Sequence, residues 1–401
     1  MSAGPPAAPS AAERPLAEHL LGFIERTWPD LAGPDPYDAL NSPLLRALAA
    51  GRRWPRILLL QALRHAPWNL RPLLGVRPHR NPKTVALLAR AYLQLGTPAA
   101  DARARQCLDW LAGSASRGYP GAGWGYSFAW QSRRLWLDRG QPSSVCTAFV
   151  ARAFLAAFAA WGEERHLVQA QRAAEFLLRA CPRQAGAISY VPHALVLVHN
   201  ANLLAAATLA QVWRASGGQA DEVREVAEAA VAFSLAEQRP DGAWPYDAQR
   251  SRPTTFVDGF HTGFVLEALD DTSCALQVDY GAALDAGLTF YRQHLLAPDG
   301  QPRRTLGRRL PTDIRDCAEA LLVLGRFADQ PGADDQRANV VDWTLRHLLD
   351  RRGFFRFEYG GRLAALDRVA YPRWQAWMAL ALLAPRGTRL TYSASAGMVE
   401  R

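Results

Sequence analysis

The loop Asp241-Gly-Ala-Trp-Pro-Tyr246 and the alanine- and leucine-rich segment 259–270 that follows it contain the pattern from which the fold is predicted. Glycine next to aromatic residues is typical of a tight loop, and the apolar segment is typical of a buried helix. The same combination occurs six times along the 401 residues, at spacings of 50 to 66 residues. The loops are 68–75, 121–126, 186–190, 241–246, 299–303 and 353–357, and the apolar segments are 84–95, 145–161, 195–214, 259–270, 313–327 and 368–384. A period of this size indicates a helical repeat architecture.

Amphipathic segments with charged faces, such as 221–238 and 334–350, lie between the apolar ones. Strand patterns are nearly absent, so the sequence predicts an all-α protein. A closed (α/α)6 toroid would place the apolar helices inside, the amphipathic helices outside and the loops at one mouth. An open α-helical solenoid buries the same faces and is the alternative. Polar residues at the starts of the apolar segments favour the closed ring, because closure brings them to one cavity.

The overall composition limits the class of protein. With 49% hydrophobic and 21% charged residues, the chain is expected to be globular. Its most apolar stretch, 145–161, carries Arg152 and does not reach the roughly 18 uncharged residues of a membrane-spanning helix. Residues 1–15 are rich in Ala, Pro and Ser, which indicates a disordered tail and no signal peptide. Five scattered cysteines without a Cys-x-x-Cys pair indicate free thiols in a cytoplasmic protein.

The basic excess lies in the first third of the chain. From Met1 to Arg139 there are 18 basic and 9 acidic residues, and from Arg46 to Arg90 there are ten basic residues and no acidic one. Arginines mixed with Trp54 and leucines are typical of a segment that rests on an anionic membrane surface. An acidic glycan or a lipid-linked phosphate is another partner of this charge, whereas nucleic acid is suggested by charge alone and is not predicted. The alternative is a solvated basic face.

These observations divide the chain into four parts. A disordered tail (1–15) precedes a basic helical segment (16–68), which is followed by the α/α toroid (69–386) and a C-terminal tail (387–401). Binding of the basic segment to the inner face of a membrane would make the cytoplasmic protein a peripheral one.

Polar and aromatic residues interrupt the apolar segments near their starts, where a toroid would gather them. The candidate catalytic residues are Asp258, His261 and Asp313. The candidate substrate-binding residues are Trp124, Tyr126, Trp130, Gln131, Arg133, His199, Asn200, Asn202, Trp244, Tyr246, Thr262, Arg373, Trp374 and Gln375. Spacings of three and four residues place several of them on one helix face, as in Asp258, His261 and Thr262. Buried polar groups need partners, so their convergence indicates a polar pocket.

This set of residue types suits a sugar. Tryptophans such as Trp124, Trp244 and Trp374 would stack on pyranose rings, and Arg373 would neutralise a uronate carboxylate. Asp258 and His261 would form the acid/base pair, with Asp313 as a second carboxylate for hydrolysis. Alternatively, a histidine with Tyr126 or Tyr246 would abstract a proton beside the carboxylate. In the simpler interpretation, Asp258 and Asp313 are helix N-caps, the histidines lie hydrogen-bonded in the core, and Arg373 closes a salt bridge.

Other chemistries find no support in the motifs. The sequence contains no HExxH, P-loop, GxGxxG or Gly-x-Ser-x-Gly pattern, and no set of residues has the spacing of metal ligands. We therefore predict neither a cofactor nor a metal.

The segment Gln238-Arg-Pro-Asp-Gly-Ala-Trp244 resembles the Gln-x3-Gly-x-Trp repeat of squalene and hopene cyclases, which implies an α/α toroid. Those cyclases protonate an alkene with an Asp-x-Asp-Asp box. Asp270-Asp271 and Asp334-Asp335 lack its third carboxylate. Terpenoid cyclase or prenyltransferase chemistry is therefore the least favoured function.

A second resemblance extends from about Asn69 to Ala384. The motifs Asn69-Leu-Arg-Pro-Leu-Leu-Gly75, Gly123-Trp-Gly-Tyr126, Trp130-Gln-Ser-Arg133, His199-Asn-Ala-Asn202, Asp258-Gly-Phe-His-Thr-Gly-Phe264 and Arg373-Trp-Gln-Ala-Trp377 carry it. They are similar to those of a bacterial toroid family found in exopolysaccharide, capsule and O-antigen loci, including a member of the vibrio biofilm polysaccharide cluster. The chain departs from that family at Gly259, where Asn is expected, and at Arg315-Asp316, where His-Ser is usual. The resemblance implies polysaccharide biosynthesis as the process and no specific reaction.

The leading hypothesis is a carbohydrate-active toroid that acts on an anionic or lipid-linked glycan, as a uronyl epimerase, lyase or hydrolase would. The second is a non-catalytic glycan-binding or membrane-associated scaffold. The two differ in whether Asp258 and His261 are needed beyond binding.

Overall fold

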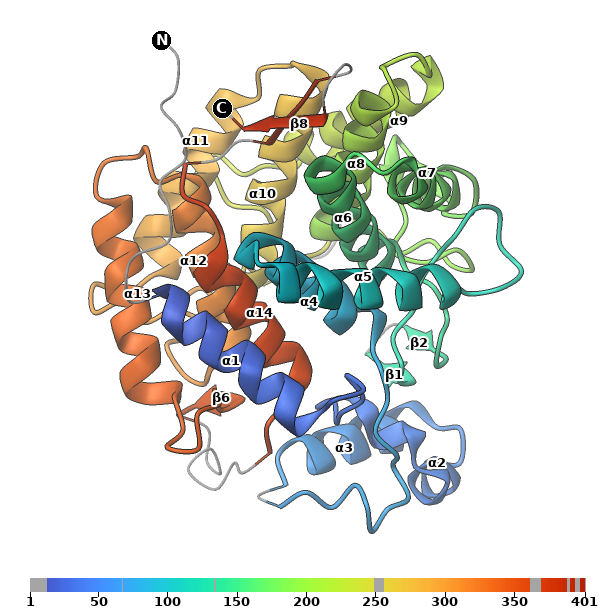
Figure 1. The fold of residues 1–401 in the computed structure, drawn as a ribbon, viewed down its shortest axis with the longest axis vertical. Coiled ribbons are helices and arrows are strands. Elements are labelled where there is room, and N and C mark those ends of the chain that lie inside the picture. Colours follow the sequence, from blue (N-terminus) through green and yellow to red (C-terminus); the bar gives the residue numbers. More distant parts are fainter. Residues whose placement is uncertain are drawn as a thin grey trace.

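The computed structural model describes residues 13–66, 68–132, 135–248, 256–360, 369–387, 390–393 and 397–400. Six inner helices form a closed ring. They are α4 (Pro82–Leu95), α6 (Ser144–Trp161), α8 (His199–Ala215), α10 (Gly259–Leu276), α12 (Ile314–Arg326) and α14 (Pro372–Leu383). Each contacts the next, and α14 returns to contact α4 (Figure 1). The predicted (α/α)6 toroid is therefore confirmed, and the open solenoid is not the fold.

Six outer helices surround the ring. They are α5 (Pro98–Gly113), α7 (Glu164–Arg179), α9 (Asp221–Ala236), α11 (Gly281–Phe290), α13 (Ala333–Leu348) and α1 (Glu13–Thr27). A five-residue π-helical turn, Tyr291–Leu295, extends α11. The inner helices are mostly apolar because nearly all of their residues are buried, whereas the outer helices bury one face.

Helix α1 completes the sixth pair, although it comes from the opposite end of the chain. It packs against α14 (Figure 1). The buried Glu13 at its start accepts bonds from Arg337 (3.1 Å) and Arg386 (2.6 Å), and so joins α1 to α13 and to the end of the ring. The boundaries thus differ from the prediction at the N-terminus. Residues 13–15 are helical, and α1 belongs to the ring and not to a separate basic segment.

A glycine packed against an outer helix explains the repeat in five of the six loops, the exception being loop 68–75, where a Cβ on Gly75 would have no neighbour within 4 Å among the described residues. Gly242 has φ +88°, and a Cβ at this position would lie 2.2 Å from the backbone oxygen of Ala286 in α11. Only glycine permits this turn and this close approach to the next outer helix. The glycines in corresponding loops also have positive φ and lie against an outer helix: Gly121 on α7, Gly186 on α9, Gly300 on α13 and Gly353 on α1.

The Gln-x3-Gly-x-Trp motif has a physical cause in the same loop. The side chain of Gln238 donates to the backbone oxygens of Gly242 and Ala283, each at 3.0 Å. The indole of Trp244 donates to the backbone oxygen of Ser234 at 2.9 Å and contacts Gly287. The motif therefore joins an outer helix to the next one along the chain.

Strands are few and short in the described residues. Three two-residue pairs lie in the loops: β1 (Trp130–Gln131) with β2 (Trp136–Leu137), β3 (Arg183–Gln184) with β4 (Ala187–Ile188), and β5 (Thr312–Asp313) with β6 (Glu358–Tyr359). A fourth pair, β7 (Leu390–Ser393) with β8 (Gly397–Glu400), lies within the predicted C-terminal tail and contacts α6, α8 and α10.

Helix α6 is long and apolar enough to cross a membrane by length and composition alone, and it is the one such helix in the described residues. It is an inner helix of the ring, and 72% of its residues are buried in the structure. Burial of this extent is what a core helix of a closed ring requires.

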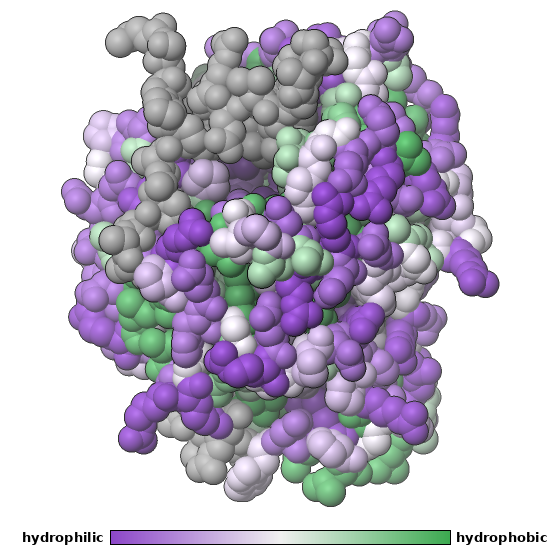
Figure 2. All heavy atoms as spheres, in the orientation of Figure 1, coloured by the Kyte–Doolittle hydropathy of each residue, from purple (hydrophilic) through white to green (hydrophobic). Residues whose placement is uncertain are grey.

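Residues 28–81 form a covering segment over the starts of the inner helices. The segment contains η1 (Asp38–Asn41), α2 (Pro43–Ala49) and α3 (Arg53–Arg64), which lie at the lower end of Figure 1. Leu40, Leu60 and Leu63 form a small apolar core with Ala129 of the loop before α6. In Figure 2, hydrophilic side chains cover most of the visible face, and hydrophobic ones gather near the lower end, where α2 lies in Figure 1.

Candidate functional site

A recess at the starts of α8 and α10 brings together seven of the predicted site residues. It has about 220 Å³ of empty space, part of it open to solvent. Its lining consists of His199, Asn200, Trp244, Pro245, Tyr246, Asp258, His261, Thr262 and Val265. The covering segment contacts the α14, α12 and α6 side of the mouth through Asp35, Arg64 and Asn41, respectively. The recess lies on the opposite side of the mouth, at α8 and α10, which these contacts leave uncovered.

Asp258 and His261 form a dyad at the first turn of α10. Oδ1 of Asp258 accepts the backbone N–H of His261 at 2.7 Å, which is the helix N-cap that the sequence suggested. Oδ2 of the same carboxylate lies 2.7 Å from Nδ1 of His261. One carboxylate therefore caps the helix and orients the imidazole. Because Nδ1 is engaged with the carboxylate, Nε2 is the nitrogen available for proton exchange.

His199 supplies a second imidazole to the recess. Its Nδ1 lies 3.0 Å from Oγ of Ser234, and burial lowers the pKa of His199 to about 4. The ring is therefore neutral at neutral pH. Nε2 of His199 and Oδ1 of Asn200 have no hydrogen-bond partner among the described residues, although both atoms are buried. Buried polar atoms usually have partners, so these two are suited to bind polar groups of a ligand.

Aromatic rings complete the recess. The Tyr246 ring lies 4.5 Å from the His261 ring, and Phe256 stacks on Tyr246 at 5.0 Å with an interplanar angle of 11°. Phe256 is 44% exposed, so this pair offers an apolar face to solvent beside the dyad. Trp244 is buried with its indole N–H bonded inside the fold, so it packs the wall and is not free to stack on a sugar.

Arg373 lies away from the recess, under the covering segment. Its Nη2 donates to Oδ1 of Asp35 at 2.8 Å, and both side chains are buried. The guanidinium also lies 4.4 Å from the ring centroid of Trp374, which stacks on Phe357. Burial raises the pKa of Asp35, although Arg373 opposes this effect. In this structure Arg373 closes a salt bridge, as the simpler interpretation held, and Trp374 is buried beneath it.

Asp313 is also enclosed. Its carboxylate lies 2.7 Å from Arg315 and 3.8 Å from Arg64 of the covering segment, and it forms a capping box with Asp316. Burial acts to raise the pKa of Asp313, but the two arginines outweigh it and the pKa lies below its ordinary value. Burial and the neighbouring Asp313 raise the pKa of Asp316. The structure thus places Asp313 in an ion pair and not beside Asp258 and His261 in the recess.

Several predicted ligand-binding residues instead hold loops in place. Asn202 bonds the backbone of Ile188 and Ala230, and Gln375 bonds both backbone groups of Phe355. The Trp124 indole donates to the backbone oxygen of Leu111 at 2.9 Å.

Residues of the loop before α6 lie near the covering segment. Gln131 bonds Arg56 and the backbone of its own hairpin, and Trp130 packs beside it. Tyr126 stacks on Phe128 at 5.2 Å, and burial raises its pKa. Arg133 lies outside the described residues.

The covering segment contributes residues that the sequence did not mark as site residues. Asp35 bonds Arg373, and Arg71 donates to Asp38 at 2.7 Å. His65 lies 3.4 Å from Glu358 before α14, and Asn41 bonds the backbone of Ser127 and Ala129 before α6. Burial raises the pKa of Asp38 to about 6. The uninterrupted basic run could not show these contacts, because the acidic partners lie outside it.

Lys83, the single lysine of the chain, meets side chains of other inner helices inside the ring. Its Nζ lies 3.8 Å from the ring centroid of Phe149, 4.4 Å from that of Trp377 and 5.2 Å from that of Phe264. Burial and the nearby Arg373 lower its pKa well below the ordinary value. Its being the only lysine among many arginines was a signal in the sequence that the site prediction did not use.

Deeper in the ring, ion pairs connect three inner helices. Arg152 of α6 lies 2.7 Å from Asp271 of α10, and Arg326 of α12 lies 3.0 Å and 2.7 Å from Asp270 and Asp271. Glu319 of α12 is buried against Gly263, where a Cβ would lie 2.4 Å from its Cγ. The interior of the ring is therefore charged, and the glycine in the motif Phe260-His-Thr-Gly-Phe264 has a packing cause.

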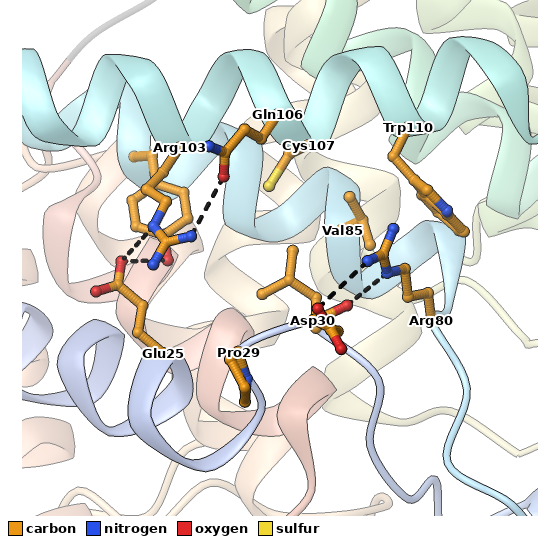
Figure 3. A pocket seen from close by; sticks show the side chains of 11 residues that line it. Glu25, Pro29, Asp30, Arg80, Val85, Arg103, Gln106, Cys107 and Trp110 are labelled. Atoms are coloured by element: carbon orange, nitrogen blue, oxygen red, sulfur yellow. Dashed lines mark hydrogen bonds and ion pairs between the residues drawn. The ribbon is translucent and has the colours of Figure 1, made fainter.

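A larger groove lies on the outside, between the end of α1, α4 and α5 (Figure 3). It has about 460 Å³ of empty space. Its charged side chains are paired with one another, Arg103 with Glu25 at 3.5 Å and Arg80 with Asp30 at 3.9 Å (Figure 3). We favour the smaller recess as the functional site, because it holds the oriented imidazole and the two unpaired polar atoms.

Comparison with solved structures supports the fold. No known protein family matches the chain, and no curated protein is similar to it in sequence. A sugar epimerase from a ruminal bacterium is similar in structure with a TM-score of 0.60 and 14% identity, over 77% of this chain and 90% of that chain. An unsaturated glucuronyl hydrolase specific for heparin has a TM-score of 0.60 and 13% identity, over 92% and 95%. Cellobiose 2-epimerase from Spirochaeta thermophila has a TM-score of 0.59 and 15% identity, over 77% and 87%. At these identities the likeness shows that this chain shares the six-hairpin toroid fold of carbohydrate-active enzymes.

Proposed function

We propose that this chain is a carbohydrate-active enzyme that transfers a proton at a carbon of an anionic glycan. The observation that carries the proposal is the 2.7 Å contact between Asp258 and His261 at a recess that also holds the neutral His199. A carboxylate that fixes the tautomer and direction of an imidazole is the arrangement of a general acid/base.

Two imidazoles suit epimerisation or elimination beside a uronate carboxylate. One imidazole removes the proton from the carbon, and the Thr262 hydroxyl and the Asn200 amide N–H, both from residues that line the recess, would donate to the charge that develops on the carboxylate. Return of a proton from the other imidazole to the opposite face inverts the carbon. If that imidazole instead protonates the oxygen on the adjacent carbon, the group leaves as an alcohol and an unsaturated sugar forms. Hydrolysis by two carboxylates is less well supported, because Asp313 is held in its ion pairs.

The biological process is proposed from the motif resemblance. The family that the motifs resemble implies the biosynthesis of a capsule, exopolysaccharide or O-antigen, with a free or lipid-linked glycan as substrate in the cytoplasm. The proteins with similar structures include a sugar epimerase and an unsaturated glucuronyl hydrolase, which agrees with a saccharide substrate. Terpenoid or prenyl chemistry fits less well, because the ring contains the buried ion pairs of Arg152 and Arg326.

A non-catalytic glycan-binding protein is the second candidate. The small size of the recess favours it, since the enclosed part of the recess is far smaller than the usual substrate pocket of roughly 300–1,000 Å³. In this case the same recess would hold a terminal sugar without reacting with it.

The test is hydrogen exchange at the substrate carbon. The protein is incubated in D2O with a panel of uronate-containing oligosaccharides, and proton NMR follows deuterium entry beside the carboxylate and the appearance of unsaturated products. We expect either change with the wild-type protein and with His193→Asn, an exposed control, and a loss with His261→Asn and Asp258→Asn. Saturable binding without exchange or product would support the second candidate. Unchanged activity in both recess variants would overturn the assignment of the dyad.

A further inference from the structure

Large apolar side chains are exposed together on the covering segment. Six of the twelve large hydrophobic residues that the described chain exposes fall within residues 44–73, and each is 55% to 84% exposed. They are Leu44, Leu48, Trp54, Leu58, Trp68 and Leu73. A group of this kind marks an interaction surface, because single exposed apolar residues are common but a concentration of them is not.

The two helices of the segment each have an outer apolar face as well as an inner one. On α3, Leu60 and Leu63 are buried in the small core of the segment, whereas Trp54 and Leu58 are exposed and lie four residues apart on one face. On α2, Leu45 is buried and Leu44 and Leu48 are exposed. The inner faces of α2 and α3 are buried in the core of the covering segment. The apolar residues of the outer faces have no such core and are exposed to solvent, so they are available to a binding partner.

The charge around these faces selects the partner. Arg52, Arg53 and Arg77 are exposed beside the apolar residues, and no acidic residue occurs between Arg46 and Arg90. Arginine attracts an anionic surface, and tryptophan and leucine insert at the boundary between lipid headgroups and acyl chains. Nucleic acid would pair with the arginines but would leave the leucines in water.

We infer that α2, α3 and the loop 68–77 dock the protein on an anionic lipid bilayer. The arginines that stay available differ from those expected from the run as a whole. Arg64 and Arg71 face Asp313 and Asp38 inside the protein, so the outer face uses the exposed Arg52 and Arg77.

The position of the exposed apolar surface on the ring determines how the protein would be oriented on the bilayer. The covering segment lies at the end of the ring where the inner helices start, and the recess of His199 and His261 opens at that same end. Docking through α2 and α3 would therefore bring the recess end of the ring to the bilayer. The docking itself does not depend on the reaction proposed for the recess.

Vesicle flotation with the full chain tests the inference. The probes are vesicles of phosphatidylcholine alone and of phosphatidylcholine mixed with phosphatidylglycerol. We expect binding to the mixed vesicles that weakens as salt is raised. Trp54→Ala with Leu58→Ala should lower the partition coefficient by about a hundredfold, because each side chain loses roughly 1.5 kcal/mol of burial in the bilayer. Arg52→Gln with Arg77→Gln should lower it by about thirtyfold, at about 1 kcal/mol per arginine.

Matched controls separate docking from folding. Val168→Ser removes an exposed apolar residue of α7, and Arg183→Gln removes an exposed arginine of β3. Both should bind as the wild type does, and the thermal midpoint of every variant is measured. Failure of the wild type to bind mixed vesicles, or binding that the Trp54 and Leu58 changes leave unaltered, would overturn the inference. So would equal binding to heparin or DNA that depends on the arginines alone.

Discussion

Nη2 of Arg373 donates a 2.8 Å hydrogen bond to Oδ1 of Asp35, a residue 338 positions earlier in the chain. The bond connects the last inner helix with the covering segment. Asp35 also lies 3.4 Å from the side-chain nitrogen of Asn81, the N-cap of α4, so one carboxylate contacts the two helices at which the ring closes.

Removing one partner of this buried pair should destabilise the protein strongly. We expect Arg373→Met to lower the free energy of unfolding by about 3 kcal/mol, because it leaves the Asp35 carboxylate buried with fewer partners. Urea denaturation measures the change. The exposed pair Arg14–Glu18 supplies the control, since Arg14→Gln should cost no more than about 0.5 kcal/mol. An equal, small effect of both changes would show that Asp35 and Arg373 are not paired in solution, and would leave Arg373 available for a substrate carboxylate.

Gly242→Ala tests the physical cause of the repeat. The new Cβ would meet the Ala286 backbone oxygen at 2.2 Å, so the loop must move away from α11. We expect a loss of about 3 kcal/mol, which combines positive-φ strain with overpacking. Gly217→Ala is the matched control, because Gly217 has φ +87° and a Cβ there would have no neighbour within 4 Å. It should cost about 1 kcal/mol. Equal losses would mean that φ alone, and not contact with the outer helix, requires glycine.

The pKa of His199 predicts how stability depends on pH. Burial lowers this pKa from 6.5 to about 4, so between these values the unfolded chain binds a proton that the native protein does not. The contribution of His199 is present above pH 6.5 and is lost as the pH falls toward 4. We expect the free energy of unfolding to fall between pH 7 and pH 5 by on the order of 1–2 kcal/mol through this residue.

Urea denaturation at the two pH values, with wild type and His199→Gln, measures that contribution. The variant should lose less stability on acidification than the wild type, whereas His193→Gln, at an exposed position, should behave as the wild type does. An unchanged pH dependence in His199→Gln would indicate that the pKa of His199 is the same in the folded and the unfolded protein.

The fold could be predicted because its causes are local. Gln238, Gly242 and Trp244 join two successive outer helices, and a glycine with positive φ recurs in the loops of Gly121, Gly186, Gly300 and Gly353. The role of α1 was less visible, since it pairs with a helix more than 300 residues away. The loop at Gly353 nevertheless indicated that a sixth outer helix was needed, because the inner helix that follows this loop is the last of the six. The outer helix against which Gly353 packs is α1.

The site was predicted only in part because the covering segment acts at long range. Asp258 and His261 are three residues apart, so the sequence itself places them together. Whether Arg373 and Asp313 are open or covered depends on Asp35 and Arg64, which no spacing relates to them. In the basic run from Arg46 to Arg90, the arginines that face inward can likewise be told from those that face outward only once their acidic partners, such as Asp313 and Asp38, are known.

Lys83 provides a chemical test of this covering, because it is the only lysine in the chain. Its lowered pKa favours the unprotonated, reactive form of the amine, so slow modification would report restricted access. We expect reductive methylation with formaldehyde to label Lys83 at least about a hundredfold more slowly in the folded protein than in urea, as for a group that reacts after local opening of about 3 kcal/mol. Mass spectrometry of the peptide containing Lys83 gives both rates. Arg373→Met should increase the rate in the folded protein, since it frees the covering segment from α14, and Arg14→Gln should not. If Lys83 reacted as fast in the native protein as in urea, the ring mouth would be open in solution, and the site would extend from the recess to the ring interior.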